Sequence, residues 1–413
     1  MGLSIGHERG ESRRVFVEAE ASLGTYPGLV SADAIRPLRF SLGGPERDRT
    51  VRDDAKGSVG ARSLDTEGVW RVPWSMAGYI YPAAAAGSMA AHGFHDVLLA
   101  AFGKYTTYAS YDKYEPESDQ TAITTLSILQ AMAEGTIDVD YLDKIWSSDQ
   151  LFGAWIDSFT LTVGGGRKAI WEVSGGAVAH AQAKRSDTAQ AGSVSTVVLS
   201  GNVDSRAYDR HATYSPRVKY VHTTPTHLDN TGAGYPVISA VDAANSITIS
   251  GGPIACGGAG GQIMPWCPSE SVPATNPLVG ISGSLALDAV ADMPITQMVF
   301  RVERTHEPET DQAFTEYVPD LFAGAERTIS LELQCRSRHD LRKYQGTKKR
   351  FTSMAVAVDI GDTAARYAEV NAGQMELEVT GGVDVPERGQ GTVNFRGRCL
   401  ESAGDDEVDF RMY

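Results

Sequence analysis

The sequence lacks the motifs that identify most enzymes and metal-binding proteins. It has no Gly-x-Ser-x-Gly nucleophile elbow, no Gly-x-x-x-x-Gly-Lys-Ser/Thr phosphate loop and no His-Glu-x-x-His zinc motif. Only four cysteines are present, and none forms a Cys-x-x-Cys pair. The residues therefore predict no catalytic site, no bound cofactor and no metal ion.

Long apolar runs and an excess of cations are also missing. The longest apolar run, around residues 81–91, is mainly alanine and too short to span a bilayer. The first residues are charged, so no secretory signal is predicted and we expect synthesis in the cytosol without membrane contact. The net charge of -15 argues against binding nucleic acid through its phosphates, although acidity also keeps a cytosolic protein soluble.

Alternation of apolar and polar residues is the strongest pattern present, and it predicts half-buried strands. Around residues 157–163, Phe159, Leu161 and Val163 form the expected core face, while Ser158 and Thr160 lie on the opposite face. A run of three glycines follows, and residues 169–173 resume the alternation. This arrangement predicts an antiparallel hairpin, and it is a better explanation of the glycines than a phosphate loop.

A similar hairpin is predicted near the C-terminus. Leu377 and Val379 are expected in the core, whereas Glu376 and Glu378 alternate onto the opposite face. A break at Gly381 and a return strand over residues 391–395 complete the pattern. Two glutamates on one face could form a glycosidase pair, but a solvated or pore-facing strand surface is the commoner arrangement.

Several elements recur in the same order in the two halves of the chain, as an old internal duplication would leave them. In each half a strand is followed by a charged loop, a second strand that begins near a glycine, and a short helical segment that opens with His-Asp. These elements are Leu38–Leu42, Gly68–Met76 and His95-Asp96 in the first half, and Met298–Val302, Gly324–Leu333 and His339-Asp340 in the second. Aspartate at such a position suits helix capping better than a catalytic dyad. Convergence of generic β patterns is the alternative to duplication.

The expected fold is mainly β, with two tandem β-sandwich or barrel domains, each flanked by a short helix, and a small inserted β module. We expect the first domain and an N-terminal extension at 1–185, the module and a Gly/Pro-rich loop at 186–277, and the second domain at 278–413. Residues 251–277 are expected to form a surface loop. Residues 121–149 leave helix and strand both open.

This order of elements resembles the tail tube, or major tail, proteins of long-tailed bacteriophages, and its recurrence in the two halves resembles their duplicated-domain type. The similarity extends over most of the chain, and segments 121–149 and the N-terminus depart from it. The segments that carry it are Gly68 with the strand leading to Asp96–Gly103, Gly153–Leu161, Gly234–Val241 before Ile247–Ser250, and the acidic ending Asp405–Phe410.

The resemblance implies a non-enzymatic structural subunit of the virion tail. Such subunits form stacked rings whose inner sheets join around a lumen. A duplicated chain would form trimeric rings with pseudo-sixfold symmetry, and hexameric rings are the alternative. The implied partners are other copies, the tape-measure and tail terminator proteins, and distal tail or baseplate proteins. DNA would pass through the lumen without specific binding.

The candidate lumen-facing residues are Glu376, Glu378, Ser158 and Thr160, and we expect the lumen-facing strand positions to be acidic or neutral so that DNA can slide. Two other functions remain possible. One is a different virion structural protein, such as a sheath, baseplate or decoration protein. The other is a carbohydrate-binding or carbohydrate-active β-protein, which tryptophans such as Trp171 would suit, although the alternation places Trp171 in the core.

Overall fold

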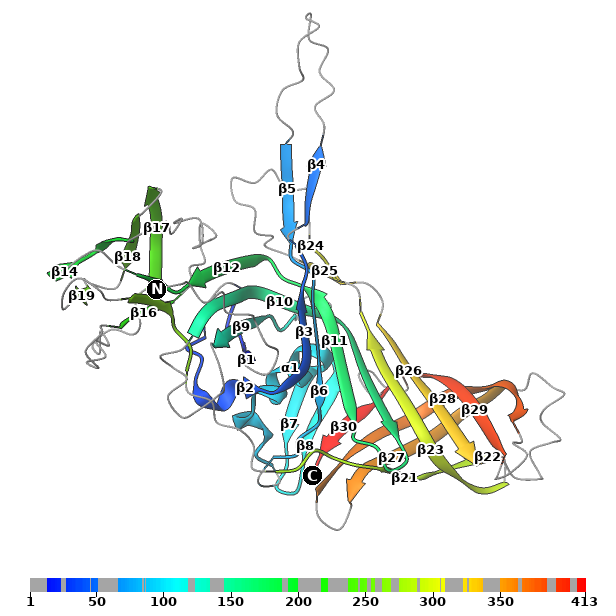
Figure 1. Ribbon diagram of the computed structural model, residues 1–413. Helices are drawn as coiled ribbons and strands as arrows, with labels where there is room; N and C mark the ends of the chain where they lie inside the picture. The colour runs from blue at the N-terminus through cyan, green and yellow to red at the C-terminus, as the bar shows by residue number, and fades with distance from the viewer. Residues whose placement is uncertain are drawn as a thin grey trace, which may run out of the picture. The chain divides into compact units, whose positions relative to one another are not determined.

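The computed structural model describes residues 13–413 with gaps, of which the longest are 51–65, 134–144, 200–216, 222–236, 309–321 and 337–349 (Figure 1). The described chain is mainly β, which confirms the expected fold class. It divides into two compact units, each described separately below. Unit 1 comprises residues 1–35, 125–154 and 177–272, and unit 2 comprises residues 36–124, 155–176 and 273–413.

Unit 2 contains one large antiparallel sheet, which we call the main sheet. Neighbouring strands are hydrogen-bonded throughout, and their directions alternate across the sheet. The strand order is β3 (Pro37–Leu42), β6 (Trp74–Tyr79), β11 (Ile170–Gly176), β10 (Ile145–Gly164, of which 155–164 belong to unit 2), β23 (Val290–Glu303), β26 (Thr328–Arg336), β29 (Thr392–Cys399) and β28 (Arg366–Asp384).

The main sheet contains the same arrangement twice. In the first half, the strands that come first, second, fourth and third along the chain lie side by side as β3-β6-β11-β10. In the second half, β23-β26-β29-β28 follow the same order. The β10–β23 ladder, from Ser158 opposite Glu303 to Gly164 opposite Gln297, joins the halves.

A hairpin separates the first two strands of each half. In the first half it consists of β4 (Glu46–Thr50) and β5 (Thr66–Arg71), and in the second half of β24 (His306–Pro308) and β25 (Phe322–Gly324). The sequence pattern predicted one strand over residues 68–76. Two strands are present instead, because Pro73 has no N–H to donate to a ladder.

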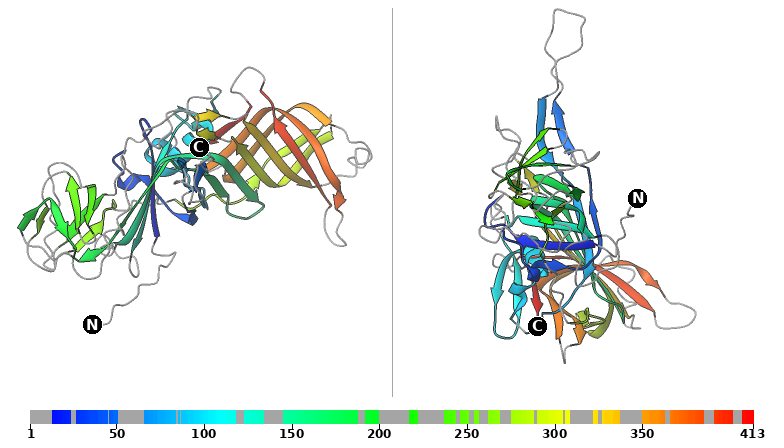
Figure 2. Two further views of the ribbon diagram at one scale, coloured as in Figure 1. Left: turned by 90° about the horizontal axis from the view of Figure 1, so that it is seen from above. Right: turned by 60° about the vertical axis from the view of Figure 1, so that its left-hand side comes forward.

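A second layer of strands covers the core of unit 2. It runs β7-β8-β30-β28-β27-β21, so β28 belongs to both layers. Its other members are β7 (Gly103–Thr107), β8 (Asp112–Pro116), β30 (Asp409–Met412), β27 (Arg350–Asp362) and β21 (Ile281–Ser282). Because β22 (Ser284–Leu287) directly follows β21 and pairs with β23, the strands of the second half close on themselves, as the curved yellow-to-red strands of Figure 2 show.

Helix α1 (Gly93–Phe102) fills the space between the two layers. It begins after the short 3-10 helix η3 (Met89–Ala91) and ends at Gly103, whose positive φ of 99° suits a left-handed C-cap. The Phe102 ring lies 5.8–6.1 Å from the rings of Phe159 on β10, Phe300 on β23 and Phe410 on β30. One helical residue therefore connects both layers and both halves of the main sheet.

Unit 1 contains a five-stranded antiparallel sheet in the order β2-β1-β9-β10-β12. Its strands are β2 (Ala34–Ile35, after the 3-10 helix η2, Ser31–Asp33), β1 (Arg13–Ala19), β9 (Leu126–Ala133), residues 145–154 of β10, and β12 (Ala179–Lys184). In the segment 121–149, which the sequence left undecided, the described residues form strands rather than a helix.

The remaining strands of unit 1 form three small sheets, two of which share an apolar core that includes Val197, Val218, Ile238 and Ile247. The expectation of a surface loop at 251–277 is wrong. This segment contains the strands β19 and β20, and its Trp266 and Cys267 are buried. The sheets are β13 (Ser186–Asp187), β20 (Gln262–Pro265) and β16 (Val218–Val221); β14 (Gly192–Val194) and β19 (Ile254–Cys256); and β15 (Thr196–Val198), β18 (Ser246–Ser250) and β17 (Val237–Ala243).

Each unit is assembled from three separate segments, whereas the domains expected at 1–185, 186–277 and 278–413 are continuous. Those boundaries remain predictions. The helical segment expected at His339-Asp340 lies outside the described residues. No helix among the described residues is both long enough and apolar enough to cross a membrane.

Candidate assembly surface

The main sheet has an edge, strand β3, that pairs on one side only among the described residues. Its single ladder joins it to β6, from Pro37 opposite Gly78 to Leu42 opposite Trp74. An edge strand presents backbone N–H and C=O groups that can bind a further strand. Leu38 on this strand is 52% exposed, so apolar surface accompanies the open hydrogen-bonding edge.

The two faces of the main sheet differ sharply in polarity. Of the predicted core residues, Phe159, Leu161, Val163 and Leu377 are fully buried, and Val379 is half-buried. Trp171, opposite Leu161, is also buried, and its indole N–H donates to the Tyr79 carbonyl oxygen at 3.0 Å. Trp171 is therefore a core residue in this structure rather than an exposed platform for sugars.

The four candidate lumen-facing residues lie together on the opposite, polar face. Partners directly across a ladder share a face, and a continuous row of such partners links two of the candidates. This row runs Thr160, Arg301, Ser330, Arg398, Glu376. Ser158 lies on the same face, where its hydroxyl is 3.0 Å from that of Ser174, and Glu378 lies opposite Arg396.

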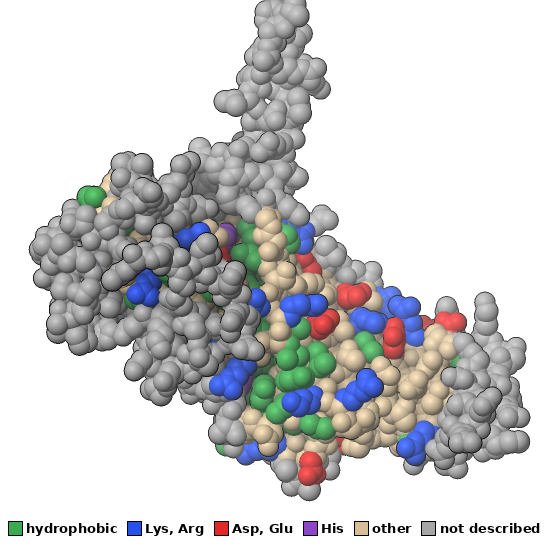
Figure 3. Space-filling model, viewed as in Figure 1, with side chains coloured by type: hydrophobic (Ala, Val, Ile, Leu, Met, Phe, Trp, Pro, Cys, Tyr) green, Lys and Arg blue, Asp and Glu red, His purple; other side chains and the backbone are tan. Residues whose placement is uncertain are grey.

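Cations and anions alternate on this polar face. Arg301 contacts Glu332 at 2.7 Å, Arg396 lies 3.8 Å from the same carboxylate, and Arg39 lies 3.5 Å from Glu172. Figure 3 shows the same intermixing of basic and acidic side chains. Cross-strand pairing therefore places arginines beside the glutamates on this face. The expectation that lumen-facing strand positions are acidic or neutral stays a prediction.

A polar contact point lies where strand β10 enters the main sheet. The ladder between β10 and β11 shifts register between Ile156 and Ser158, which leaves Asp157 as a bulge residue. A Cβ on Gly175 would lie 1.8 Å from the carbonyl oxygen of Trp155, so only glycine fits opposite this bulge. A bulge redirects a side chain, and here it turns the Asp157 carboxylate toward the bases of the two hairpins.

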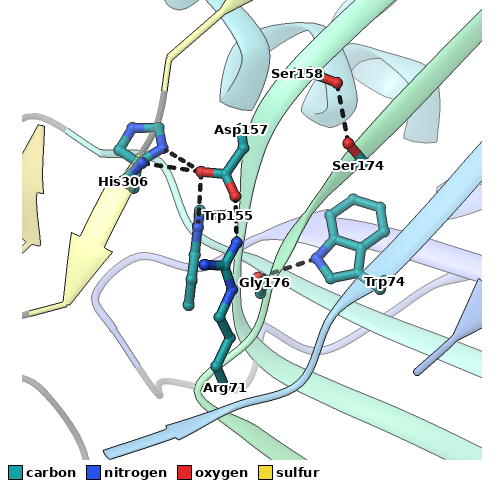
Figure 4. Close-up of polar contacts among 8 residues, drawn as sticks. All are labelled: Arg71, Trp74, Trp155, Asp157, Ser158, Ser174, Gly176 and His306. Carbon is teal, nitrogen blue, oxygen red and sulfur yellow. Dashed lines mark hydrogen bonds and ion pairs between the residues drawn. The ribbon is translucent and has the colours of Figure 1, made fainter. Parts of the chain in front are cut away.

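Asp157 binds both hairpins with its two carboxylate oxygens (Figure 4). Oδ2 accepts from Arg71 Nη2 at 2.8 Å, at the end of β5. Oδ1 accepts from the His306 backbone N–H at 2.9 Å and lies 3.3 Å from His306 Nδ1, at the start of β24. Trp155 Nε1 also donates to Oδ1, at 3.1 Å, and the Arg71 guanidinium lies over the Trp155 ring. We call these four residues the hairpin anchor.

Sequence reasoning missed the hairpin anchor. Its only signal was an aspartate at the start of an otherwise alternating run, and the spacings of Arg71 and His306 from Asp157 are 86 and 149 residues. The His306 side chain is 5% exposed and that of Asp157 is 17% exposed, whereas that of Arg71 is 39% exposed, so the His306 side of the contact point is shielded from water and the Arg71 side is partly open. Charged hydrogen bonds are stronger in such surroundings than at an open surface.

A second buried polar cluster lies beside the start of helix α1. The Asp112 carboxylate, fully buried, accepts from the Tyr105 hydroxyl at 2.6 Å and from the Met89 N–H at 2.9 Å, and His95 Nδ1 lies 2.8 Å from the Tyr114 hydroxyl. Burial lowers the pKa of His95, while the nearby Asp112 charge opposes that shift. These groups satisfy one another, which indicates a structural network rather than an exposed catalytic dyad.

The N-cap of α1 also differs from the expectation. The side chain of His92, not of Asp96, provides the cap, since Nδ1 of His92 accepts from the Phe94 N–H at 3.1 Å. Asp96 lies in the first turn, where its charge complements the helix dipole.

Metal binding and thiol chemistry find no support in the described part of the chain. No group of three or more His, Cys, Asp or Glu side chains there could bind a metal ion. Cys335 and Cys399 are buried and unbonded to each other, and burial raises the pKa of each thiol to about 12. No model of a known protein family matches the sequence, and no curated protein is significantly similar to it.

Proposed function

We propose that this chain is the structural subunit of a phage tail tube, in which copies join edge to edge into rings and the rings stack. The observation that carries the proposal is the repeated strand order of the main sheet together with the ladder that joins its halves. In one chain, the last strand of the first half pairs with the first strand of the second half. The same contact between chains would join the last strand, β28, to the open edge β3 of a neighbour.

The direction of the strands fits this contact. All pairs in the main sheet are antiparallel, so directions alternate, and β28 runs opposite to β3 at the other end of the sheet. The β10–β23 ladder is antiparallel as well. A β28–β3 contact between copies would therefore repeat the internal contact without reversing a strand, and it would remove the open edge.

In the isolated chain, the first residues of β27 occupy the outer side of β28. Arg350 and Phe351 lie opposite Glu378 and Leu377, and the register then shifts twice before a regular ladder begins at Val356. Irregular ladders lose hydrogen bonds and are weaker than regular ones. This short segment is the part of the chain that a neighbouring β3 would displace.

The proposed assembly is a trimeric ring, in which three copies supply six similar halves, with a hexameric ring as the alternative. Its other partners would be tape-measure, terminator and distal tail proteins. DNA would pass along the polar face, where paired arginines and glutamates present little net charge. The proposed role is structural, without enzymatic activity.

Electron microscopy combined with cross-linking tests the proposal. Purified protein at rising concentration should form hollow cylinders of uniform width in negative stain. The variant Ser41→Cys with Glu378→Cys should form disulfide-linked oligomers under mild oxidation, because the two positions lie on the strands proposed to meet. The matched control is Lys104→Cys with Glu378→Cys, since Lys104 is an exposed residue of β7.

Two results would contradict the proposal. One is a protein that stays monomeric at all concentrations and with other tail proteins present. The other is equal cross-linking of the two cysteine pairs, which would show random collision instead of a β28–β3 contact.

A further inference from the structure

The two end strands of the main sheet carry opposite charges on its polar face. Arg39 is the only charged residue of β3, whereas residues 375–380 of β28 include two charged residues, Glu376 and Glu378. A row of ladder partners crosses the whole sheet, beginning at the cation Arg39 and ending at the anion Glu376. At these positions, one end strand is basic and the other is acidic.

The charged groups on the end strands are exposed to solvent. The Arg39 side chain is 63% exposed, and its guanidinium lies 3.5 Å from Glu172 on β11, two strands away. Glu378 is exposed as well, and its ladder partner Arg396 lies 3.8 Å from Glu332. No ion pair joins Glu378 to another side chain in the part of the chain that the structure describes. Exposed contacts of this kind contribute little, so both groups can bind a further partner.

The two halves of the main sheet can be matched residue by residue. Phe40 on β3 and Phe300 on β23 are both buried, and each is the third residue of its repeated segment. From Phe40, a row of ladder partners leads to Phe159 on β10. The corresponding row from Phe300 leads to Leu377 on β28. Phe159 in the first half therefore corresponds to Leu377 in the second.

The ladder that joins the halves then gives a register for the contact between copies. In that ladder, Phe300 lies opposite Leu161. The residue of the second half that corresponds to Leu161 is Val379, so the same ladder between copies places Phe40 opposite Val379. Val379 is only half-buried, and on the side of β27 residues 379–384 have no ladder partner among the described residues. This part of β28 can therefore pair with a further strand.

We infer that Arg39 of one copy and Glu378 of the next copy form an ion pair that selects the β28–β3 contact and its register. In the register above, Ser41 lies opposite Glu378. Arg39 lies two residues further along, opposite Thr380, and is a diagonal neighbour of Glu378 on the polar face. Long side chains reach each other across such a diagonal. The inference rests on the proposed function, which supplies the contact, and adds the residues that determine which strands meet.

The same charges disfavour contacts between like strands. Two β3 strands would bring two copies of Arg39 to one contact, and two β28 strands would do the same with Glu376 and Glu378. Like charges across an interface lower the affinity and suppress wrong partners. The charges on the end strands therefore favour β28–β3 contacts over contacts between identical strands.

Charge reversal tests the ion pair in assembling protein. Arg39→Glu and Glu378→Arg each replace attraction with repulsion at every contact, and each should raise the protein concentration needed for cylinders by about tenfold. The double variant restores opposite charges and should assemble near the wild-type concentration. Both residues are exposed, so circular dichroism and thermal unfolding should stay close to those of the wild type.

Two control variants make the same charge changes at exposed positions outside β3 and β28. Lys104→Glu on β7 matches Arg39→Glu. Glu401→Arg, shortly after β29, matches Glu378→Arg. Both controls should form cylinders at the wild-type concentration.

An equimolar mixture of the two single variants tests the same contact without the double variant. Alternating copies of Arg39→Glu and Glu378→Arg have opposite charges wherever they meet. Six copies can alternate completely around a ring, whereas three copies leave one like-charge contact. The mixture should therefore assemble at a lower concentration than either variant alone, and the recovery should be complete only for rings of six copies.

Three results would overturn the inference: normal assembly of both single variants, a folded double variant that does not recover, or an equal loss of assembly in the controls. Wild-type cylinders would still support the proposed function in each case. A wild-type chain that never forms cylinders would contradict the proposed function itself.

Discussion

Two histidines at the start of helix α1, of which His95 is buried and His92 is half-buried, make the fold sensitive to acid. Burial lowers the pKa of His92 to about 4, and the neighbouring His95 adds to the shift. Because the folded pKa is below the ordinary value of 6.5, the unfolded chain binds a proton at mildly acidic pH that the folded chain does not bind. The stability of the fold that depends on neutral His92 is therefore complete above pH 6.5 and is lost as the pH falls toward 4.

Urea unfolding at several pH values measures this effect. The free energy of unfolding should fall by up to about 3 kcal/mol between pH 7 and pH 4 from this histidine. His92→Asn keeps a side chain that can cap the helix and removes the titrating group. Its stability should depend less on pH than that of the wild type, and an unchanged pH dependence would contradict the assignment.

Two neighbouring residues of β10 give opposite predictions for the same substitution. Phe159 is fully buried and its ring packs against Phe102 and Phe300, so Phe159→Asp places an unpartnered charge in the core. We expect a loss of about 4 kcal/mol or more, with insoluble or unfolded protein. Thr160→Asp, on the polar face, should fold, since Arg301 lies directly opposite on one side and offsets the repulsion from Glu172 on the other. Thermal unfolding of the soluble variants checks both, and a stable Phe159→Asp protein would show that the strand faces are assigned incorrectly.

At the scale of strands and helices, the sequence predictions that succeeded were based on the alternation of apolar and polar residues. The pairing of Phe159 with Val173 and of Leu161 with Trp171 follows from two short alternating runs around a glycine turn. Such a pattern is local, so it needs no knowledge of the rest of the chain.

The features that the sequence did not predict depend on contacts between segments that are distant along the chain. His92 caps α1 because η3 brings it into position, although histidine is not a preferred capping residue. The glycine-rich stretch at 251–277 forms strands because β16 and β14 pair with it, which its own composition does not indicate. The arginines opposite Glu376 and Glu378 depend on a register that only the folded sheet defines.

That register changes the outcome expected for charge reversal on β28. Glu376 lies opposite Arg398, so Glu376→Arg places two cations on neighbouring strands and should lower the free energy of unfolding by about 0.5–1 kcal/mol. The double variant Glu376→Arg with Arg398→Glu exchanges the partners and keeps the net charge. It should recover most of the lost stability.

Chemical unfolding of the single and double variants forms a complete mutant cycle. If the stability loss of the double variant equals the sum of the losses of the two single variants, the two side chains do not interact across the ladder. If the chain has the proposed function, genome ejection by virions carrying the exchanged pair would report on the lumen, because the sheet itself is unchanged in stability.

At the scale of the whole molecule, the small sheets of unit 1 are the part most easily removed. Ser186 and Ile263 are partners in a ladder, so the ends of the intervening segment already lie side by side. Replacing residues 187–262 with a short Gly/Ser linker should preserve unit 2, whose strands all lie outside this segment. Exchange protection of β10, β11 and β23 residues should match the wild type, and loss of that protection would show that unit 2 depends on the removed sheets.

The two ends of the main sheet are different strands, β3 and β28, and this difference has a geometric consequence for assembly. The proposed contact between β28 and β3 would use two different surfaces, so it would be heterologous and could not be completed by a pair of copies related by a twofold axis. Every copy added through it must point the same way around the ring axis. A ring built in this manner has two chemically distinct rims, and a column of such rings has a polarity from one end to the other. Growth, capping and the passage of a long polymer through that column would each have an inherent direction.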